Sequence, residues 1–152
     1  MHPFPHRYGV TASGASQGSV AVSAAGLPDI ATQPPPEFGG PGGCWSPESL
    51  LVAAVADCFI LSFRAVARAS RVEWEQLDVE VEGVLDRVEG TTRFTGFIVK
   101  PRLRIAAATN EQAALAALHK AEHVCLVTNS LLAPCELRPE VTIVGAAQAA
   151  AQ

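Results

Sequence analysis

The stretch SPESLLVAAVADCFIL, residues 46–61, predicts the helix around which the rest of the fold is organised. Ser46 is a favourable N-cap, Pro47 suits the first helical turn, and the Glu48 carboxylate favours the positive end of the helix dipole. The apolar residues that follow lie on every side of the helix, which is typical of a central, buried helix. We expect this helix to run to about Ala69.

A second helix is predicted to begin at Asn110, a favourable N-cap with Glu111 beside it. Its apolar residues fall at positions i, i+4, i+7 and i+11, which lie on one helical face, and they are Ala114, Leu118, Ala121 and Cys125. The Cys125 side chain is therefore expected to point in the same direction as the buried residues.

The remaining segments read as strands. Small and β-branched residues predict an antiparallel pair and a third short strand, at residues 8–12, 19–23 and 29–33. Period-two alternation predicts a long hairpin, in which Val79, Val81, Phe94, Ile98, Leu103 and Ile105 are buried and acidic residues face Lys100, Arg102 and Arg104. A final strand is expected at residues 136–144, and residues 145–152 are expected to be a flexible tail. This element order predicts a single α+β domain over residues 1–152.

Composition narrows the classes of function. With 152 residues, 49% of them hydrophobic and 17% charged, the chain is expected to bury one real core. The net charge is −4 and the Lys and Arg residues are scattered, which argues against a nucleic-acid or anionic-membrane partner. The longest apolar run, residues 50–63, is shorter than the ~20 residues of a membrane span. The N-terminus shows no secretory signal, so we expect a cytoplasmic protein whose four cysteines are reduced at rest.

Cys58 and Cys125 stand out because each lies on a predicted buried helix. A thiol in a partly apolar site near a second thiol can attack an oxidant and then be trapped as a disulfide, so the pair suggests a thiol peroxidase. The competing interpretation is that both are small core residues, since free cysteine is commonly buried and inert. Cys44 and Cys135 are expected to be bystanders.

Two motifs resemble the OsmC/Ohr family of hydroperoxide-detoxifying proteins. The first is GGPGGCWSPESLL at residues 39–51, followed by the Cys58 region, and the second is HVCLVTNSL at residues 123–131. The resemblance implies an OsmC-like fold, with antiparallel sheets packed around two central helices, in an intertwined homodimer with active sites at the subunit boundary. It also implies that Cys58 is the peroxidatic cysteine, Cys125 the resolving cysteine and Glu48 an active-site carboxylate.

The chemistry that the resemblance implies is attack of the Cys58 thiolate on an organic hydroperoxide or hydrogen peroxide, followed by a Cys58–Cys125 disulfide. A dithiol reductant, such as a lipoylated protein, restores the thiols, and no metal or organic cofactor is expected. Glu48 and Cys58 are ten residues apart, which is roughly 15 Å along a straight helix. If both serve one site, two copies of the chain must supply them.

Two features of the sequence depart from the family pattern. The family has an arginine near the reactive thiolate, but no Lys, Arg or His lies between Arg7 and Arg64, and the loop position that carries this arginine in one subfamily reads Ser16. The second departure is Leu126, where the family often has proline.

Two alternative functions stay open at this stage. The missing arginine supports a non-catalytic module of the same fold that binds a small apolar ligand. A zinc site using His119, His123 and Cys125 is a weaker reading, because no second cluster completes four ligands. Asp57, inside an apolar helix, needs either a partner or an exit to solvent.

Overall fold

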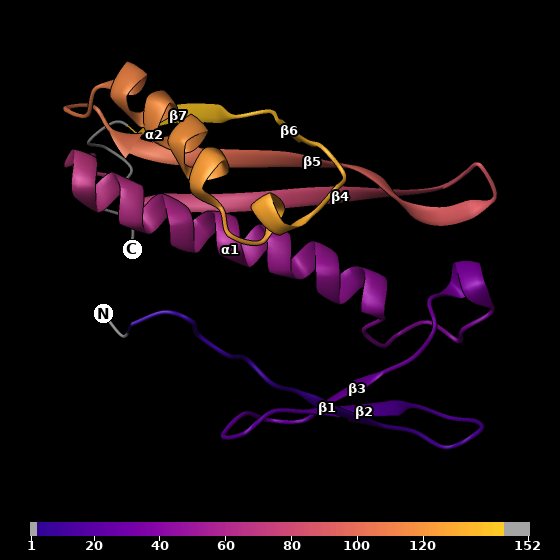
Figure 1. Ribbon diagram of the computed structural model, residues 1–152. Helices are drawn as coiled ribbons and strands as arrows, with labels where there is room; N and C mark the ends of the chain where they lie inside the picture. The colour runs from indigo at the N-terminus through magenta and orange to yellow at the C-terminus, as the bar shows by residue number, and fades with distance from the viewer. Residues whose placement is uncertain (1–2, 145–152) are drawn as a thin grey trace. The chain divides into compact units, whose positions relative to one another are not determined.

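The computed structural model describes residues 3–144 (Figure 1). Its contacts divide the chain into two compact units, the first ending at Leu51 and the second beginning at Val52. The boundary falls inside the first helix, α1 (Pro47–Ser70). The predicted helix is thus confirmed with nearly the expected bounds.

The first unit contains a three-stranded antiparallel sheet of order β1-β2-β3. The three strands are shorter than predicted: β1 (Thr11–Ser13), β2 (Val20–Ser23) and β3 (Ile30–Thr32). β2 and β3 lie within the predicted segments, whereas β1 overlaps the end of its segment and includes Ser13, which was assigned to the loop. A short 3-10 helix, η1 (Pro36–Phe38), follows β3. The chain then doubles back so tightly that a Cβ on Gly40 would collide with the carbonyl oxygen of Pro34. Only glycine fits at this position.

The second unit is built on a long antiparallel hairpin of β4 (Gln76–Val88) and β5 (Thr91–Ala106). The predicted final strand is in fact two strands, β6 (Cys135–Leu137) and β7 (Glu140–Val144), which both pair with β5 in parallel. The second sheet is therefore mixed, and the expectation of wholly antiparallel sheets is wrong. A helix lies between β5 and β6, and such a crossover connection is what allows parallel pairing.

The two faces of the hairpin have different environments. On the outer face, the Lys100 ammonium lies 2.9 Å from the Glu80 carboxylate and 3.4 Å from that of Glu82, as the predicted cross-strand charge pairing requires. The assignment of Ile98 to the buried face is wrong, because Ile98 lies opposite Glu82 on the outer face. The buried side chains of β5 are instead Phe97, Val99, Leu103 and Ile105, together with Pro101.

Two helices pack on the inner face of this sheet. Helix α2 (Glu111–Val124) begins as predicted, since the Asn110 side chain accepts a hydrogen bond from the Ala113 N–H at 3.0 Å. The predicted buried face of α2 is confirmed, because all four of its residues are fully buried, namely Ala114, Leu118, Ala121 and Cys125. Helix α1 contributes Val55, Phe59 and Phe63 to the same core.

Helix α1 is less buried than its sequence predicts. In its apolar 18-residue window, whose mean hydropathy is 2.0, 28% of the residues are buried. By length and composition alone this helix could cross a membrane, which differs from the shorter span expected from the sequence. Leu61 is 51% exposed and Asp57 is also exposed, so the Asp57 carboxylate reaches solvent. The exposed face of α1 thus carries both an apolar side chain, Leu61, and a charged one, Asp57, one helical turn apart.

Candidate active site

Cys58 lies on α1, and its side chain is half-buried. Burial raises the pKa of the Cys58 thiol, because the charged thiolate is poorly solvated there. The Val127 N–H and the Ser62 side chain oppose this shift by hydrogen bonding to the sulfur, whereas Cys125 adds to it. Cys58 therefore holds its proton more tightly than an ordinary cysteine.

Cys125 closes helix α2 as its C-cap residue, in an extended backbone conformation that ends the helix. It is fully buried, and its carbonyl oxygen accepts hydrogen bonds from the Thr128 hydroxyl at 3.2 Å and from the Asn129 N–H at 3.1 Å. Burial opposes ionisation of the Cys125 thiol, but hydrogen bonds from Thr128, Cys58 and Val127 outweigh burial and lower its pKa. Hydrogen bonding thus favours the thiolate form of Cys125.

The two thiols act as one titrating pair. Each is hydrogen-bonded to the other, and this bond raises the pKa of Cys58 while it lowers that of Cys125. Ionisation of either sulfur therefore depends on the protonation state of the other. The structure therefore brings together the two cysteines that the sequence singled out.

The turn after Cys125 supplies the polar groups around the thiols. Residues Thr128–Ser130 form the 3-10 helix η2, which the Ser130 N–H helps to close by donating to the Val127 carbonyl oxygen at 3.0 Å. Sequence reasoning did not assign a role to Ser62, Val127 or Thr128. Two signals in the sequence could have identified these residues. Val127 and Thr128 lie within the HVCLVTNSL motif, and Ser62 lies one helical turn after Cys58.

Glu48 lies in the first turn of α1, after a reciprocal cap. The Ser49 N–H donates to the Ser46 hydroxyl at 3.2 Å, and the Ser46 N–H donates to the Ser49 hydroxyl at 2.8 Å. This arrangement confirms Ser46 as the N-cap and fixes the start of the helix. The Glu48 Oε2 atom is buried without a hydrogen-bond partner. Glu48 lines a small cavity of the first unit, whereas Cys58 belongs to the second unit.

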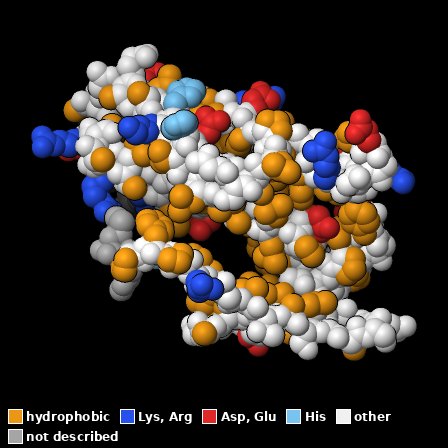
Figure 2. Space-filling view, in the orientation of Figure 1, with side chains coloured by type: hydrophobic (Ala, Val, Ile, Leu, Met, Phe, Trp, Pro, Cys, Tyr) orange, Lys and Arg blue, Asp and Glu red, His pale blue; other side chains and the backbone are white. Residues whose placement is uncertain are grey.

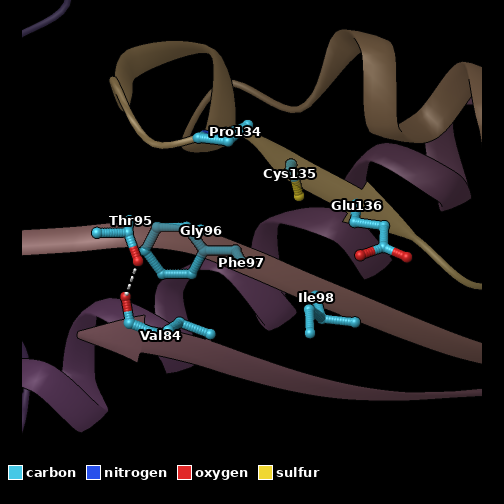
Figure 3. A pocket seen from close by; sticks show the side chains of 8 residues that line it. All are labelled: Val84, Thr95, Gly96, Phe97, Ile98, Pro134, Cys135 and Glu136. Carbon is cyan, nitrogen blue, oxygen red and sulfur yellow. Dashed lines mark hydrogen bonds between the residues drawn. The ribbon is translucent and has the colours of Figure 1, made fainter. Parts of the chain in front are cut away.

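The other two cysteines differ in their surroundings. Cys44 is exposed. Cys135 is on β6, and in Figure 3 its sulfur points from β6 toward β5, inside a pocket of about 280 Å³ that Phe97 and Ile98 also line. Burial, and then the nearby charges of Glu122 and Cys125, raise the pKa of Cys135 to about 11. Cys135 is therefore a neutral thiol near neutral pH, although it lies close to Cys125.

The zinc reading has no support in the part of the chain that the structure describes. Within residues 3–144, no group of three or more His, Cys, Asp or Glu side chains is arranged to hold a metal ion. His119 and His123 are exposed, and Figure 2 shows histidine side chains at the surface over α2, whereas Cys125 is buried beneath. On the face shown in Figure 2, Lys and Arg side chains are scattered.

Comparison with known proteins identifies the family. The OsmC-like protein family matches residues 40–140. The protein YmaD of Bacillus subtilis (strain 168), itself uncharacterised, is 30% identical over 112 residues, which cover 72% of this chain and 75% of YmaD. An organic hydroperoxide resistance protein of Xanthomonas axonopodis pv. citri is 32% identical over 123 residues, which cover 79% of this chain and 82% of that protein.

Similarity to a solved structure supports the same family. The crystal structure of an organic hydroperoxide resistance protein OsmC from Legionella pneumophila superimposes with a TM-score of 0.73 at 26% identity, covering 92% of this chain and 99% of the other. The match to the family begins in the Gly-rich loop before α1 and continues to β7, so it includes both helices and both sulfurs of the thiol pair. This chain belongs to the OsmC-like protein family and has the α+β fold of that family.

Proposed function

We propose that this protein is a cysteine-based peroxidase that reduces organic hydroperoxides or hydrogen peroxide, with Cys58 as the attacking sulfur and Cys125 as the resolving sulfur. The observation that carries the proposal is the hydrogen-bonded pair of thiols, of which only one reaches the surface. The relatives that are named for organic hydroperoxide resistance support the same reaction class.

Accessibility decides which sulfur attacks. Cys125 is 0% exposed, so a peroxide molecule cannot reach it in the folded chain, whereas Cys58 is half-buried. Cys58 has the higher pKa of the two, but the neighbouring Cys125 thiolate can accept its proton across their hydrogen bond. The Cys58 thiolate forms as it attacks.

The reaction then follows in two balanced steps. The Cys58 sulfur attacks the terminal oxygen of R–O–O–H and the O–O bond breaks. The leaving alkoxide takes the proton that Cys125 received from Cys58, so that an alcohol leaves and Cys125 is again a thiolate. Cys58 is now a sulfenic acid. The Cys125 thiolate attacks the Cys58 sulfur and expels hydroxide, which takes a proton from the solvent and leaves as water, so that a Cys58–Cys125 disulfide forms. The two sulfurs together give two electrons to the peroxide.

An external dithiol is required to complete the cycle. It reduces the disulfide by thiol–disulfide exchange, and a lipoylated protein has the appropriate chemistry. The thiols must be reduced between turnovers, so the proposal places the protein in the reducing environment of the cytoplasm. Neither step calls for a metal or an organic cofactor.

The proposal includes a homodimer in which Glu48 acts on the site from the partner subunit. Leu61 of α1 is 51% exposed, and burying this side chain against a second copy would remove apolar surface from water, which supports an interface of this kind. Glu48 and Cys58 are ten residues apart on one helix, roughly 15 Å along its axis, so one copy of α1 does not bring them together.

Hydroperoxide consumption with an excess of dithiol tests the proposal. We expect the wild-type chain to turn over an alkyl hydroperoxide, and Cys58→Ser to lose activity by at least about a hundredfold, since the nucleophile is removed. Cys44→Ser is the matched control, because Cys44 is exposed in a loop and outside the proposed chemistry. Full turnover by the Cys58→Ser variant refutes the assignment.

A further inference from the structure

The turn that follows Cys125 brings backbone N–H groups to both sulfurs of the thiol pair. The Val127 N–H donates to Cys58 and to Cys125, and the Thr128 N–H donates to Cys125. Burial raises the pKa of Cys58, and the Val127 N–H is the strongest of the contacts that lower it again. The position of one backbone N–H therefore affects how readily either sulfur becomes a thiolate.

The turn is closed by hydrogen bonds among its own residues. The Thr128 hydroxyl and the Asn129 N–H both donate to the Cys125 carbonyl oxygen, at 3.2 Å and 3.1 Å. The Ser130 hydroxyl donates to the Leu126 carbonyl oxygen at 2.8 Å. These bonds hold the turn together, but they do not prevent rotation about the Cα–C bond of Cys125. In such a rotation the Cys125 carbonyl group moves with the turn, whereas the Cys125 side chain stays with α2.

The Asn129 side chain connects this turn to the helix before it. Its Nδ2 atom donates to the His123 carbonyl oxygen at 3.0 Å, six residues back. His123 lies in the last turn of α2, where carbonyl oxygens have no partner within the helix. The bond spans Cys125, so it opposes the rotation that the bonds inside the turn leave free.

The residue after Cys125 does not itself limit this rotation. A proline at position 126 would favour the extended region for Cys125, close to the observed φ of −66° and ψ of 114°. The chain has Leu126 there, and its side chain is 76% exposed. The conformation of Cys125 therefore depends on contacts between the turn and its surroundings, and the bond from Asn129 to His123 is such a contact.

We propose that Asn129 is a positioning residue for the thiol pair. Its amide fixes the turn against α2, so that the Val127 N–H lies where it donates to both sulfurs and stabilises negative charge on Cys58 during attack. The catalytic meaning of this role rests on the proposed peroxidase, whereas its effect on the thiols requires no peroxide.

Alkylation of Cys58 by iodoacetamide across a pH series, quantified by peptide mass spectrometry, tests the proposal in Asn129→Leu. This variant keeps the approximate shape of an exposed side chain and removes its donor. We expect the pH midpoint to rise by about 0.5–1 pH unit, because a hydrogen bond to the thiolate is weakened. An unchanged or lowered midpoint overturns the proposal.

The titratable neighbours of the turn stay the same in this comparison. Those that line a pocket with Asn129 are Glu122 and His123 of α2 and Cys135 of β6. The substitution alters none of these side chains and leaves the net charge at −4, so a shift of the midpoint reports the donors at the sulfur.

Thr109→Val is the matched control. The Thr109 hydroxyl, just before α2, donates to the Glu73 carbonyl oxygen at 3.1 Å, so this variant also loses one side-chain-to-backbone hydrogen bond near an end of α2. We expect similar losses of stability in urea for both variants, but a shifted midpoint for Asn129→Leu alone. An equal shift in Thr109→Val overturns the proposal, because general loosening of the fold then accounts for the effect.

Leu126→Pro, added to Asn129→Leu, tests the rotation at Cys125 directly. We expect the double variant to recover at least about half of the shift, since the proline restricts the Cys125 backbone. A double variant that keeps the full shift overturns the proposed role of Asn129. If the midpoints behave as expected while the wild-type chain consumes no hydroperoxide, the positioning role is supported and the proposed peroxidase is refuted.

Discussion

The thiol of Cys58, on helix α1, is hydrogen-bonded to the thiol of Cys125, at the end of helix α2. The contact gives the two sulfurs opposite character, since Cys58 is accessible and holds its proton, whereas Cys125 is buried and ionises more readily. Reactivity in this protein is therefore a property of the pair. Four measurements on the chain follow from this contact and from the packing around it.

One equivalent of hydroperoxide is expected to link Cys58 to Cys125. The sulfenic acid at Cys58 lies beside a sulfur with a lowered pKa, and the thiolate is the form that attacks. Peptide mass spectrometry under non-reducing conditions measures which sulfurs become joined. In Cys125→Ser we expect a sulfenic acid that a dimedone-type reagent traps at Cys58. A dominant disulfide through Cys44 or Cys135 would contradict the pairing.

Removing the partner sulfur is expected to make Cys58 more acidic. Cys125 raises the pKa of Cys58 through its hydrogen bond and its charge, so in Cys125→Ala the pH midpoint of Cys58 alkylation shifts downward. Iodoacetamide labelling of Cys58 across a pH series gives the midpoint. Thr128→Val is the companion variant, because it removes the hydroxyl that lowers the pKa of Cys125 and is expected to move the first ionisation of the pair upward. An upward shift in Cys125→Ala would show that the thiol contact is absent.

Cys135 is expected to make the stability of the protein fall at alkaline pH. The unfolded thiol ionises near 9.0 and the folded thiol near 11, so the folded state binds the proton more tightly. The stabilisation is complete below the unfolded pKa and is lost as the pH rises through the folded pKa. Cys135 is partly exposed, so solvent screening reduces the effect to about 1 kcal/mol.

Urea unfolding at pH 8 and at pH 11 measures this change for the wild type and for Cys135→Ala. Other groups titrate in the same range, so the informative quantity is the difference between the two proteins. The alanine variant is expected to lose less stability than the wild type over this interval. Identical losses in both proteins would mean that the Cys135 environment does not favour the neutral thiol.

Gly83→Ala is expected to destabilise the fold by ~1–3 kcal/mol. A Cβ at Gly83 would lie 2.8 Å from Val52 Cγ2 on α1 and 2.8 Å from Phe94 Cε1 on β5, so these packed side chains, or the elements that carry them, would have to shift. Gly96→Ala is the matched control in the same hairpin, because its nearest neighbour, the Pro134 carbonyl oxygen, is at 3.8 Å. Urea denaturation compares the two variants.

Shortening the clashing side chain tests the cause of this loss. Val52→Ala combined with Gly83→Ala is expected to recover part of the stability that Gly83→Ala loses, beyond the sum of the two single effects. Strictly additive losses would place the cost of Gly83→Ala elsewhere than in the approach of α1 to the sheet.

Local signals in the sequence were sufficient for most of the elements. The Asn110 cap and the Ser46–Pro47 start located both helices, because capping depends on residues within one turn. The alternation of Glu80 and Glu82 against Lys100 predicted the hairpin and its outer ion pairs. The predicted buried face of α2 was correct for the same reason, since helical periodicity is a local property.

The errors arose where a distant contact decides the local structure. The final strand is split into β6 and β7, and the Arg138 N–H between them donates to the Val99 carbonyl oxygen of β5 at 2.8 Å. Ile98 was assigned to the wrong face because side chains alternate regularly between the two faces only while the strand pairing is regular. A bulge after Val84 shifts the pairing register of β4 and β5, and this shift changes which residues face the core. The exposure of α1 depends on what covers it, which periodicity does not encode.

The sequence by itself determined the order of strands and helices, the caps of the helices, and the two motifs that place the chain in the OsmC-like family. Only the tertiary structure decided that the Cys58 and Cys125 thiols touch and that the Glu48 oxygen lies unpaired in a cavity with Gln33. The physical reason is the separation along the sequence between the residues that determine each property. Helix and strand patterns come from residues a few positions apart, whereas the proton affinity of a buried group depends on whatever atoms folding brings to within a few ångströms of it.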